Sequence, residues 1–431
     1  MRSVIISDFG SVNGGAAKVA IESARGLAEA GVEIVFACAI GPVSDRLDHP
    51  RIHVEMFRGE EIWKVGSKLA AARQGIWNAP AHAFLRALLS RQPAGTLVHL
   101  HQWTKAFSPA AIAAAGESGL PVAITMHDYF SFCPVGGYFD FKAGTPCTRE
   151  PMSVSCIASN CDRASYVHKL VRVARQWRSD EAMRSLRAPL FIHVSDFARR
   201  FAEPFLPKTA RHAVVENMME AERRPPADVA SNRHALFLGR FTQEKAGDIL
   251  ARAALIAGMP VRFVGEGPLA QEIGRVNPDA EIRGWVPAER VFDEIAQARC
   301  LVLPSLWYEP GPLVIAEARS LGVPVVLART TGPASWIVDG EDGVLVDGGD
   351  VEGLAGALGR MKDDALAAAM GKAAYRRYWA DPLTTERHVA RTIDAYRSLI
   401  GGHGARVTAA RGQRGLPNHA PDRTAAKSIM P

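Results

Sequence analysis

Short apolar segments rich in β-branched residues alternate with longer Ala- and Leu-rich segments along most of the chain. The short segments have the length of buried strands, and the longer ones show a helical period. In the first half we expect a helix at 16–31 that ends at a glycine, and strands at 3–8, 33–40, 97–102, 121–128 and 190–196. In the second half we expect strands at 234–240, 261–267, 280–285, 300–305, 323–328 and 343–347.

This alternation predicts an α/β fold in which parallel sheets are covered by helices on both faces. A polar, proline-bearing segment divides the two series of strands, so we expect two Rossmann-like domains. The expected organisation is a first domain at 1–220, a linker at 221–233, a second domain at 234–382, a further helix at 383–400 and a tail at 401–431. Open α/β sheets bind ligands at the carboxyl ends of their strands. The motifs below all follow an expected strand.

Charge and hydropathy exclude several classes of protein. The formal net charge is +6, and residues 403–431 hold five Arg or Lys against one Asp, so +4 lies in this segment. Its Gly, Ala, Pro and Arg content predicts a disordered tail, whereas a nucleic-acid-binding protein would carry its positive charge on a folded face. No apolar run approaches the roughly 20 residues of a membrane span, and the N-terminus does not fit a signal peptide. We therefore expect a cytoplasmic protein.

Two loops of the second half have the composition of a phosphate site. Arg240 and Lys245 follow one expected strand and stand beside a helix start, where two cations favour an anion such as a diphosphate. The alternative is a pair of solvated cations. Gly265 and Glu266 lie in a G-x-G turn after the next strand, where glycine allows a ligand to approach the backbone. A G-x-G motif alone is also typical of a plain tight turn.

Two glutamates accompany a Gly- and Pro-rich turn at 308–312, one within the turn and one after it. Glu309 lies in the loop and Glu317 lies in the helix that follows. Gly311 and Leu313 can offer backbone N–H groups beside them, but Pro312 has none. Paired hydroxyls of sugars and riboses are suitable partners for such carboxylates, although each acid can also be an ordinary loop or surface glutamate.

The order of these motifs resembles the retaining GT-B glycosyltransferases of family four, also called glycosyl transferases group 1. The resemblance covers about 234–350 and rests on "GRFTQEK", "GEGPL", "RGWVP", "PSLWYEPGPLVIAEA", "GVPVV" and "DGEDGVLVDGGD". Many members have E-G-F-G-L where this chain has E-P-G-P-L, and the "WYE-x-x-P" form resembles a subgroup that acts in polysaccharide assembly. The resemblance implies two parallel sheets that face each other across a cleft, and a final helix at 383–400 that crosses back to the first domain.

The resemblance also implies roles for individual residues. Arg240 and Lys245 would hold the diphosphate of a UDP-, GDP- or ADP-sugar without a catalytic metal. Glu309 and the nearby amides of Gly311 and Leu313 would contact the donor sugar. Glu317 would bind the ribose hydroxyls.

The first half supplies the rest of the expected site. Gly14 and Gly15 end a loop that resembles the family's N-terminal loop and would approach the donor phosphate and the acceptor. His127, with Asp128, stands at a strand end, where the family commonly has a histidine. We expect His127 to contact the donor sugar or to orient the acceptor, and the alternative is a histidine that fixes a loop. His99 and His101 share one face of a strand, and acceptor contact or packing is expected for them.

Four cysteines lie within one loop of the first half, namely Cys133, Cys147, Cys156 and Cys161. In a cytoplasmic protein such a cluster favours a structural zinc site, although the spacing lacks a C-x2-C pair. Two reversible disulfides or free buried thiols are the alternatives. Cys38 and Cys300 lie in expected strands and are predicted to be core residues.

The segment that follows this loop predicts a basic amphipathic helix. Arg163, Lys169, Arg172, Arg175 and Arg178 alternate there with aromatic and aliphatic residues. Such a helix can bind an anionic membrane surface, or it can be an ordinary core-facing helix with a solvated basic face. In relatives this side of the first domain meets the acceptor, which is often a lipid-linked glycan.

The sequence therefore predicts a retaining glycosyltransferase that moves a sugar from a nucleotide sugar to a glycan or lipid-linked glycan, in cell-surface polysaccharide synthesis. A location at the inner face of the cytoplasmic membrane fits this activity. A sugar-nucleotide epimerase of the same fold, or a glycan-binding or scaffold protein with a degenerate site, is the alternative.

Overall fold

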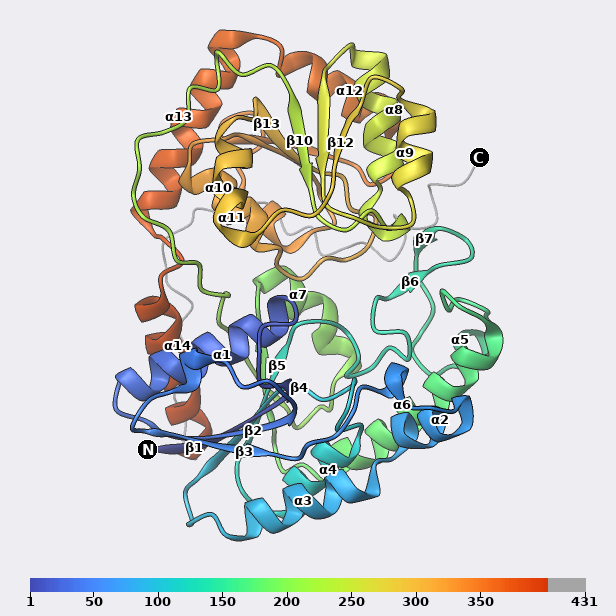
Figure 1. Ribbon diagram of the computed structural model, residues 1–431, viewed down its shortest axis with the longest axis vertical. Helices are drawn as coiled ribbons and strands as arrows, with labels where there is room; N and C mark the ends of the chain where they lie inside the picture. The colour runs from blue at the N-terminus through green and yellow to red at the C-terminus, as the bar shows by residue number, and fades with distance from the viewer. Residues whose placement is uncertain (402–431) are drawn as a thin grey trace. The chain divides into compact units, whose positions relative to one another are not determined.

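The computed structural model describes residues 1–401, and the predicted tail lies outside the described residues. The described chain forms two compact units. Unit 1 comprises 1–138, 147–218 and 385–401, and unit 2 comprises 139–146 and 219–384. Each unit contains one large sheet whose strands are all parallel, with helices on both faces (Figure 1). This confirms the predicted fold class.

The sheet of unit 1 has the order β3-β2-β1-β4-β5-β8-β9. Its strands are β1 (Arg2–Phe9), β2 (Glu33–Ile40), β3 (Ile52–Met56), β4 (Leu97–Gln102), β5 (Val122–Met126), β8 (Leu190–His193) and β9 (Arg211–Val214). The five predicted strands form the centre of this sheet. The sequence pattern missed β3 and β9, the two edge strands. Both are partly exposed and carry polar residues, because an edge strand has only one neighbour to pack against.

Helices cover both faces of this sheet. They are α1 (Gly15–Glu29), α2 (Lys68–Ile76), α3 (Ala79–Ser90), α4 (Ala110–Glu117), α5 (Val154–Ala158), α6 (Tyr166–Arg184), α7 (Asp196–Ala202) and α14 (Thr385–Ile400), with single turns at η1 (Asp45–Leu47), η2 (Ile62–Lys64) and η3 (Glu203–Phe205). The helix α14 packs on α1, and their contact is close because a Cβ at Gly26 would lie 2.6 Å from Cγ2 of Val389. The C-terminal helix thereby belongs to unit 1.

The sheet of unit 2 has the order β12-β11-β10-β13-β14-β15. Its strands are β10 (Ala235–Leu238), β11 (Val261–Val264), β12 (Glu281–Arg283), β13 (Cys300–Leu303), β14 (Val325–Ala328) and β15 (Gly343–Val346). All six strands predicted for the second half are present. A separate two-stranded hairpin consists of β6 (Phe139–Asp140) and β7 (Thr145–Pro146).

The helices of unit 2 also lie on both faces of its sheet (Figure 1). They are α8 (Gly247–Ala257), α9 (Ala270–Val276), α10 (Ala288–Ala296), α11 (Leu313–Ser320), α12 (Val351–Arg360) and α13 (Asp364–Ala380), with single turns at η4 (Gln243–Lys245) and η5 (Gly332–Trp336). The buried strand residues contact α8 and α12 on one face and α11 on the other. Of the helices within residues 1–401, none is long and apolar enough to cross a bilayer.

Candidate functional site

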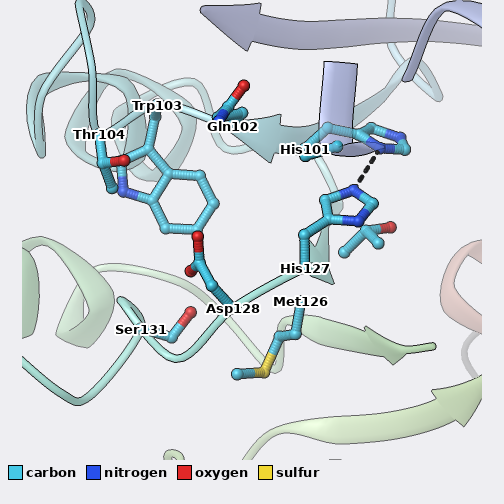
Figure 2. Close-up of a pocket in the computed structure, with 10 residues that line it drawn as sticks. His101, Gln102, Trp103, Thr104, Met126, His127, Asp128 and Ser131 are labelled. Carbon is cyan, nitrogen blue, oxygen red and sulfur yellow. Dashed lines mark hydrogen bonds between the residues drawn. The ribbon is translucent and has the colours of Figure 1, made fainter. Parts of the chain in front are cut away.

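A pocket lies at the carboxyl ends of β4 and β5 in unit 1. Figure 2 shows His101 and His127 facing each other, with Asp128 and Trp103 nearby. The lining residues come from the ends of β4 and β5, from the loops that follow these strands and from the first turn of α1, and they are Ala16, His101, Gln102, Trp103, Thr104, Thr125, Met126, His127, Asp128 and Ser131. The sequence analysis had singled out His101, His127 and Asp128, and the fold brings them to one pocket.

Three histidines form a connected row beside this pocket. Nδ1 of His101 lies 3.1 Å from Nε2 of His127, and the ring centroids of His99 and His101 are 4.1 Å apart. His99 hydrogen-bonds through its two nitrogens to Tyr396 Oη at 2.6 Å and Thr125 Oγ1 at 2.7 Å. Burial lowers the pKa of His99 and of His127 to about 3, and that of His101 well below its usual value. All three imidazoles are therefore neutral near pH 7.

The row determines which nitrogen of His127 carries a proton. In a neutral pair, one of the two facing nitrogens donates and the other accepts. Nε2 of His101 is buried and has no hydrogen-bond partner in the described residues. An unpaired N–H is the rarer state of a buried polar group, which favours the proton on Nδ1 of His101. That nitrogen then donates to Nε2 of His127 and leaves Nδ1 of His127 as a donor.

Asp128 contributes a carboxylate with an unusual pKa to the pocket. Burial raises the pKa of Asp128 to about 6, against the lowering effects of the Phe130 N–H and of the Arg175 and Lys105 charges. The Phe130 N–H donates to this carboxylate at 3.0 Å. In Figure 2 the carboxylate points toward the Trp103 ring. Asp128 therefore changes charge close to neutral pH, within reach of a molecule that enters the pocket.

The carboxylate of Asp8 holds the loop that supplies one wall of this pocket. It accepts the backbone N–H groups of Lys105, Ala106 and Phe107 at 2.7 to 3.0 Å. Asp8 is fully buried, and this burial raises its pKa. Sequence reasoning gave Asp8 no role, although its place at the end of the first apolar strand was a usable signal.

The two glycines of the first loop lie at the start of α1. Gly14 is the N-cap residue with φ of 111°, which side chains rarely adopt, and it has no side-chain capping bond. A Cβ at Gly14 or Gly15 would meet nothing within 4 Å. The next residue, Ala16, lines the pocket. The glycine loop therefore leads directly into the pocket that His127 lines.

In unit 2 the loops after β10 and β11 are packed backbone against backbone. A Cβ at Gly265 would lie 2.1 Å from the carbonyl oxygen of Gly239, and a Cβ at Gly267 would lie 2.4 Å from that of Phe241. The Phe241 N–H donates to the carbonyl of Glu266 at 2.8 Å. The G-x-G motif thus brings its loop against the loop that carries Arg240. Tight backbone packing therefore requires these glycines.

Lys245 and Glu309 form a direct ion pair at this edge of the sheet. Their side chains are only 13% and 6% exposed, and the Ser305 hydroxyl donates to the second carboxylate oxygen of Glu309 at 2.7 Å. The Lys245 ammonium also lies 5.7 Å from the centre of the Trp307 ring. The Arg240 side chain is 68% exposed, and its guanidinium lies 3.7 Å from the Glu244 carboxylate.

Backbone hydrogen bonds fasten four strand-end loops to one another in unit 2. The Leu306 N–H donates to the carbonyl of Glu244 at 2.9 Å, and the Gly332 N–H donates to that of Glu309 at 2.7 Å. The loops after β10, β11, β13 and β14 therefore form one connected surface. Arg240, Lys245, Glu309 and Gly265 all lie on it.

The last group of predicted residues belongs to the start of α11. Pro312 is the N-cap, without a side-chain capping bond, and Leu313 is the first helical residue. Gly311 lies just before the cap, so that it and Leu313 stand where α11 directs its first backbone N–H groups. Glu317 lies one turn into α11 and is half-buried.

The four loop cysteines are all buried in unit 1. Across residues 1–401, no group of three or more His, Cys, Asp or Glu side chains is arranged to hold a metal ion, so the zinc hypothesis gains no support there. Instead, the fully buried Lys169 donates to Cys161 Sγ at 3.1 Å and to Cys156 Sγ at 3.6 Å. Cys38 and Cys300 are buried in β2 and β13, as predicted.

The basic face predicted for 163–178 needs a correction. Lys169 and Arg175 are buried and do not face solvent. Arg175 donates to the carbonyl of Pro134 at 2.9 Å and lies 4.6 Å from the centre of the Phe130 ring. Arg172 pairs with the buried Asp162 at 2.7 Å. These cations hold the cysteine loop, and the sequence pattern did not separate them from solvated ones.

Two family models match the chain and together cover most of it. The description "Glycosyltransferase Family 4" matches residues 13–223, and "Glycosyl transferases group 1" matches residues 232–364. The first match contains the unit 1 pocket. The second contains Arg240, Lys245, Glu309 and Glu317.

Curated relatives match parts of the chain. An exopolysaccharide phosphotransferase of Streptomyces coelicolor is 32% identical over 222 residues, which are 47% of this chain and 23% of that protein. A GDP-mannose-dependent alpha-(1-6)-phosphatidylinositol monomannoside mannosyltransferase of Mycolicibacterium smegmatis is 29% identical over 223 residues, which are 45% of this chain and 58% of that protein. The chain thus spans less than two thirds of the length of these relatives.

The fold is that of solved GT-B proteins. HepE of Anabaena, solved in complex with UDP-glucose, superposes with a TM-score of 0.61 at 17% identity, over 92% of this chain and 100% of HepE. The two parallel α/β sheets described above therefore form a GT-B fold.

We predict that mild acid destabilises unit 1 through its buried histidines. The unfolded chain binds protons on histidine near pH 6.5, whereas the folded pKa of His99 and His127 is about 3. The free energy of unfolding should therefore fall as the pH is lowered from about 6.5 toward 3, by up to ~1.4 kcal/mol per pH unit for each histidine. Urea unfolding between pH 7.5 and 5 measures this slope.

The variant His101→Asn removes one of these groups and keeps an N–H near the position of Nδ1, so its slope should be shallower than that of the wild type. His53 is exposed, and His53→Asn is the matched control with an unchanged slope. An equal slope for His101→Asn and the wild type would contradict the prediction.

Proposed function

Because the chain belongs to the group 1, family 4 glycosyltransferases, we propose that it transfers a hexosyl group from a nucleotide sugar to a glycan or lipid-linked glycan with retention of configuration. The observation that carries this proposal is the connected surface of unit 2, on which Arg240, Lys245 and Glu309 lie at the carboxyl ends of the strands. Synthesis of cell-surface polysaccharide is the proposed pathway. The alignment with an exopolysaccharide phosphotransferase supports it.

The donor diphosphate is proposed to bind at Arg240 and Lys245. When the sugar leaves, negative charge develops on the diphosphate oxygen, and fixed cations that face this oxygen stabilise the transition state. Arg240 is exposed and can reach a ligand, whereas Lys245 is held in place by Glu309. These two cations take the role of a catalytic metal in the proposal.

The remaining residues of this surface are proposed to bind the sugar and the ribose. Glu309 and the amides of Gly311 and Leu313 would accept and donate hydrogen bonds at the donor sugar, and Glu317 would bind the ribose hydroxyls. Gly265 and Glu266 would border the nucleotide, because their loop packs on the Arg240 loop. HepE was solved with UDP-glucose and the mycobacterial relative is GDP-mannose-dependent, so we propose a UDP-, GDP- or ADP-sugar as the donor.

The pocket of unit 1 is proposed to position the acceptor hydroxyl. His127 presents an Nδ1–H donor, and Asp128 presents a carboxylate that is ionised above about pH 6. A hydroxyl can accept from the first and donate to the second. Trp103 offers a ring face to the apolar side of a sugar. Gly14 and Gly15 lie just before Ala16 of this pocket and are proposed to approach a phosphate, because a Cβ at either would meet nothing within 4 Å.

A face of unit 1 is proposed to contact an anionic membrane. The helix α6 packs against α2 and α5 (Figure 1), and these helices and η2 expose large apolar side chains, namely Trp63, Leu69, Val154, Val167, Leu170 and Trp177. Exposed cations accompany them, namely Lys64, Lys68, Arg73 and Arg163. Apolar side chains with cations on one face favour an anionic interface. A lipid-linked acceptor at the inner face of the cytoplasmic membrane fits this arrangement.

We predict that Arg240→Ala weakens nucleotide binding without affecting the fold. A lost charge-assisted hydrogen bond costs about 1.5 to 3 kcal/mol, so Kd should rise roughly tenfold or more. Thermal shifts with UDP, GDP and ADP identify the base, and titration with the best nucleotide gives Kd. Arg290 has a similar exposure of 65% and a similar carboxylate neighbour, so Arg290→Ala is the control with unchanged binding.

Absence of a thermal shift with all three nucleotides would contradict the donor site and favour a glycan-binding or scaffold protein. Release of an isomerised sugar nucleotide without any acceptor would favour an epimerase.

We predict that the unit 1 pocket determines acceptor use and its pH dependence. His127→Ala and Asp128→Asn should each lower kcat/KM for the acceptor at least tenfold, while the KM for the donor stays constant. Because the folded pKa of Asp128 is about 6, wild-type kcat/KM should fall tenfold per pH unit below this value. The acidic limb should be absent in Asp128→Asn, and its persistence would exclude Asp128 as the titrating group.

We predict that Trp63→Ser with Leu69→Ser reduces binding to vesicles that contain anionic lipid, measured by flotation. Leu255 and Ile256 of unit 2 are also exposed, at 50% and 52%, and Leu255→Ser with Ile256→Ser is the matched control with unchanged binding. Equal flotation of wild type and the Trp63 and Leu69 double variant would discard the membrane face.

A further inference from the structure

The ammonium group of Lys169 is buried beside two sulfur atoms. Lys169 lies in the first turn of α6 and is 0% exposed. Its Nζ donates to Cys161 Sγ at 3.1 Å and to Cys156 Sγ at 3.6 Å. In the described part of the chain, neither a carboxylate nor a backbone carbonyl accepts a hydrogen bond from it. A buried ammonium is costly unless an anion compensates it, and the adjacent groups that can become anions are these two thiols.

The other two loop cysteines differ from this pair. Burial raises the pKa of the Cys133 thiol to about 12 and also raises the pKa of Cys147, so both remain thiols. Burial lowers the pKa of Lys169, but the hydrogen bond that it donates to Cys161 and the electrostatic effect of the nearby cysteines outweigh this and raise that pKa. The buried Nζ of Lys169 therefore faces Cys161 Sγ directly, at hydrogen-bond distance. A thiolate is the form of cysteine that oxidants attack.

We propose that Lys169 and Cys161 form an oxidative cross-link in which one oxygen atom bridges Nζ and Sγ. Dioxygen is the oxidant. The balanced step is Lys–NH2 + HS–Cys + O2 → Lys–NH–O–S–Cys + H2O, and this balance is the same whichever of the two groups holds the shared proton. The N–O and O–S bonds form, and one N–H bond, the S–H bond and the O–O bond break. Nitrogen and sulfur each lose two electrons, and the second oxygen atom leaves as water.

The position of the pair favours this product over a disulfide. Cys161 is nearer to Nζ than Cys156 is, and a N···S distance of 3.1 Å needs little movement for a bridging oxygen. The bridge also removes the buried charge, because the product nitrogen is neutral. A disulfide between the two cysteines would consume both of the thiols that contact the buried Lys169 Nζ and would leave its charge in place.

The cross-link would fasten the cysteine loop to α6 covalently. The same loop begins with Asp128 and Ser131, which line the unit 1 pocket, and Arg175 of α6 already binds it through Pro134. The cross-linked protein should therefore have a more stable unit 1 than the reduced protein. This inference does not depend on the proposed transferase activity.

The test is mass spectrometry of the full chain. Protein purified with reductant and without oxygen should gain one oxygen and lose two hydrogens in air, and tandem spectra should place the change between Lys169 and Cys161. Dithiothreitol should reverse it, with a lower Tm. Cys161→Ser and Lys169→Arg should abolish the mass change. Cys156→Ser is the matched control and should retain it.

Three outcomes would overturn the proposal. A loss of two hydrogens without oxygen that disappears in Cys156→Ser shows a disulfide. An unchanged mass after exposure to air, with one zinc per chain by elemental analysis, shows a metal site. An unchanged mass without metal shows free thiols. These readings need no folded Cys161→Ser variant, because the wild type and Cys156→Ser distinguish all of them.

Discussion

The ion pair between Lys245 and Glu309 is the interaction on which the arrangement of unit 2 depends most. Both side chains are almost buried, and a buried charge without its partner would be expensive. The pair fixes the loop after β13 against the turn after β10, and the Leu306 backbone bond to Glu244 repeats this connection. The Gly332 backbone bond to Glu309 adds the loop after β14. Exposed Arg240 stands beside this rigid frame. The surface therefore combines one exposed cation with one that is held in place.

The strand ends of unit 1 carry a row of neutral histidines, whereas those of unit 2 carry charged side chains. His99, His101 and His127 remain uncharged because burial lowers the pKa of each. A ring contact joins His99 to His101, and a hydrogen bond joins His101 to His127. Tyr396 of α14 holds the inner end of this row. The C-terminal helix is thus part of the support of a pocket that is formed by residues near position 100 and position 127. The helix α14 lies close to the sheet's helix α1, because it packs directly on Gly26.

Much of the fold could be predicted because buried parallel strands are continuous apolar runs, and every central strand has such a run. The edge strands β3 and β9 were missed because they are partly exposed and resemble loops in the sequence. The polar residues at the strand ends could also be predicted as a group, because a polar residue directly after a buried apolar run is easy to recognise. Asp8 has this signal as well, but its carboxylate is used for backbone N–H groups and not for a ligand.

The sequence by itself determined the two α/β units, the strand ends at which polar residues gather, and the family to which the motifs belong. Local pattern suffices for these features, because strand and helix periods are set by neighbouring residues. Only the tertiary structure decided which charges compensate one another. Lys169 and Arg172 stand three residues apart on one helix, yet one contacts two sulfurs and the other a carboxylate. Spacing could not distinguish the two, because their partners come from a loop whose path is fixed by contacts between distant residues.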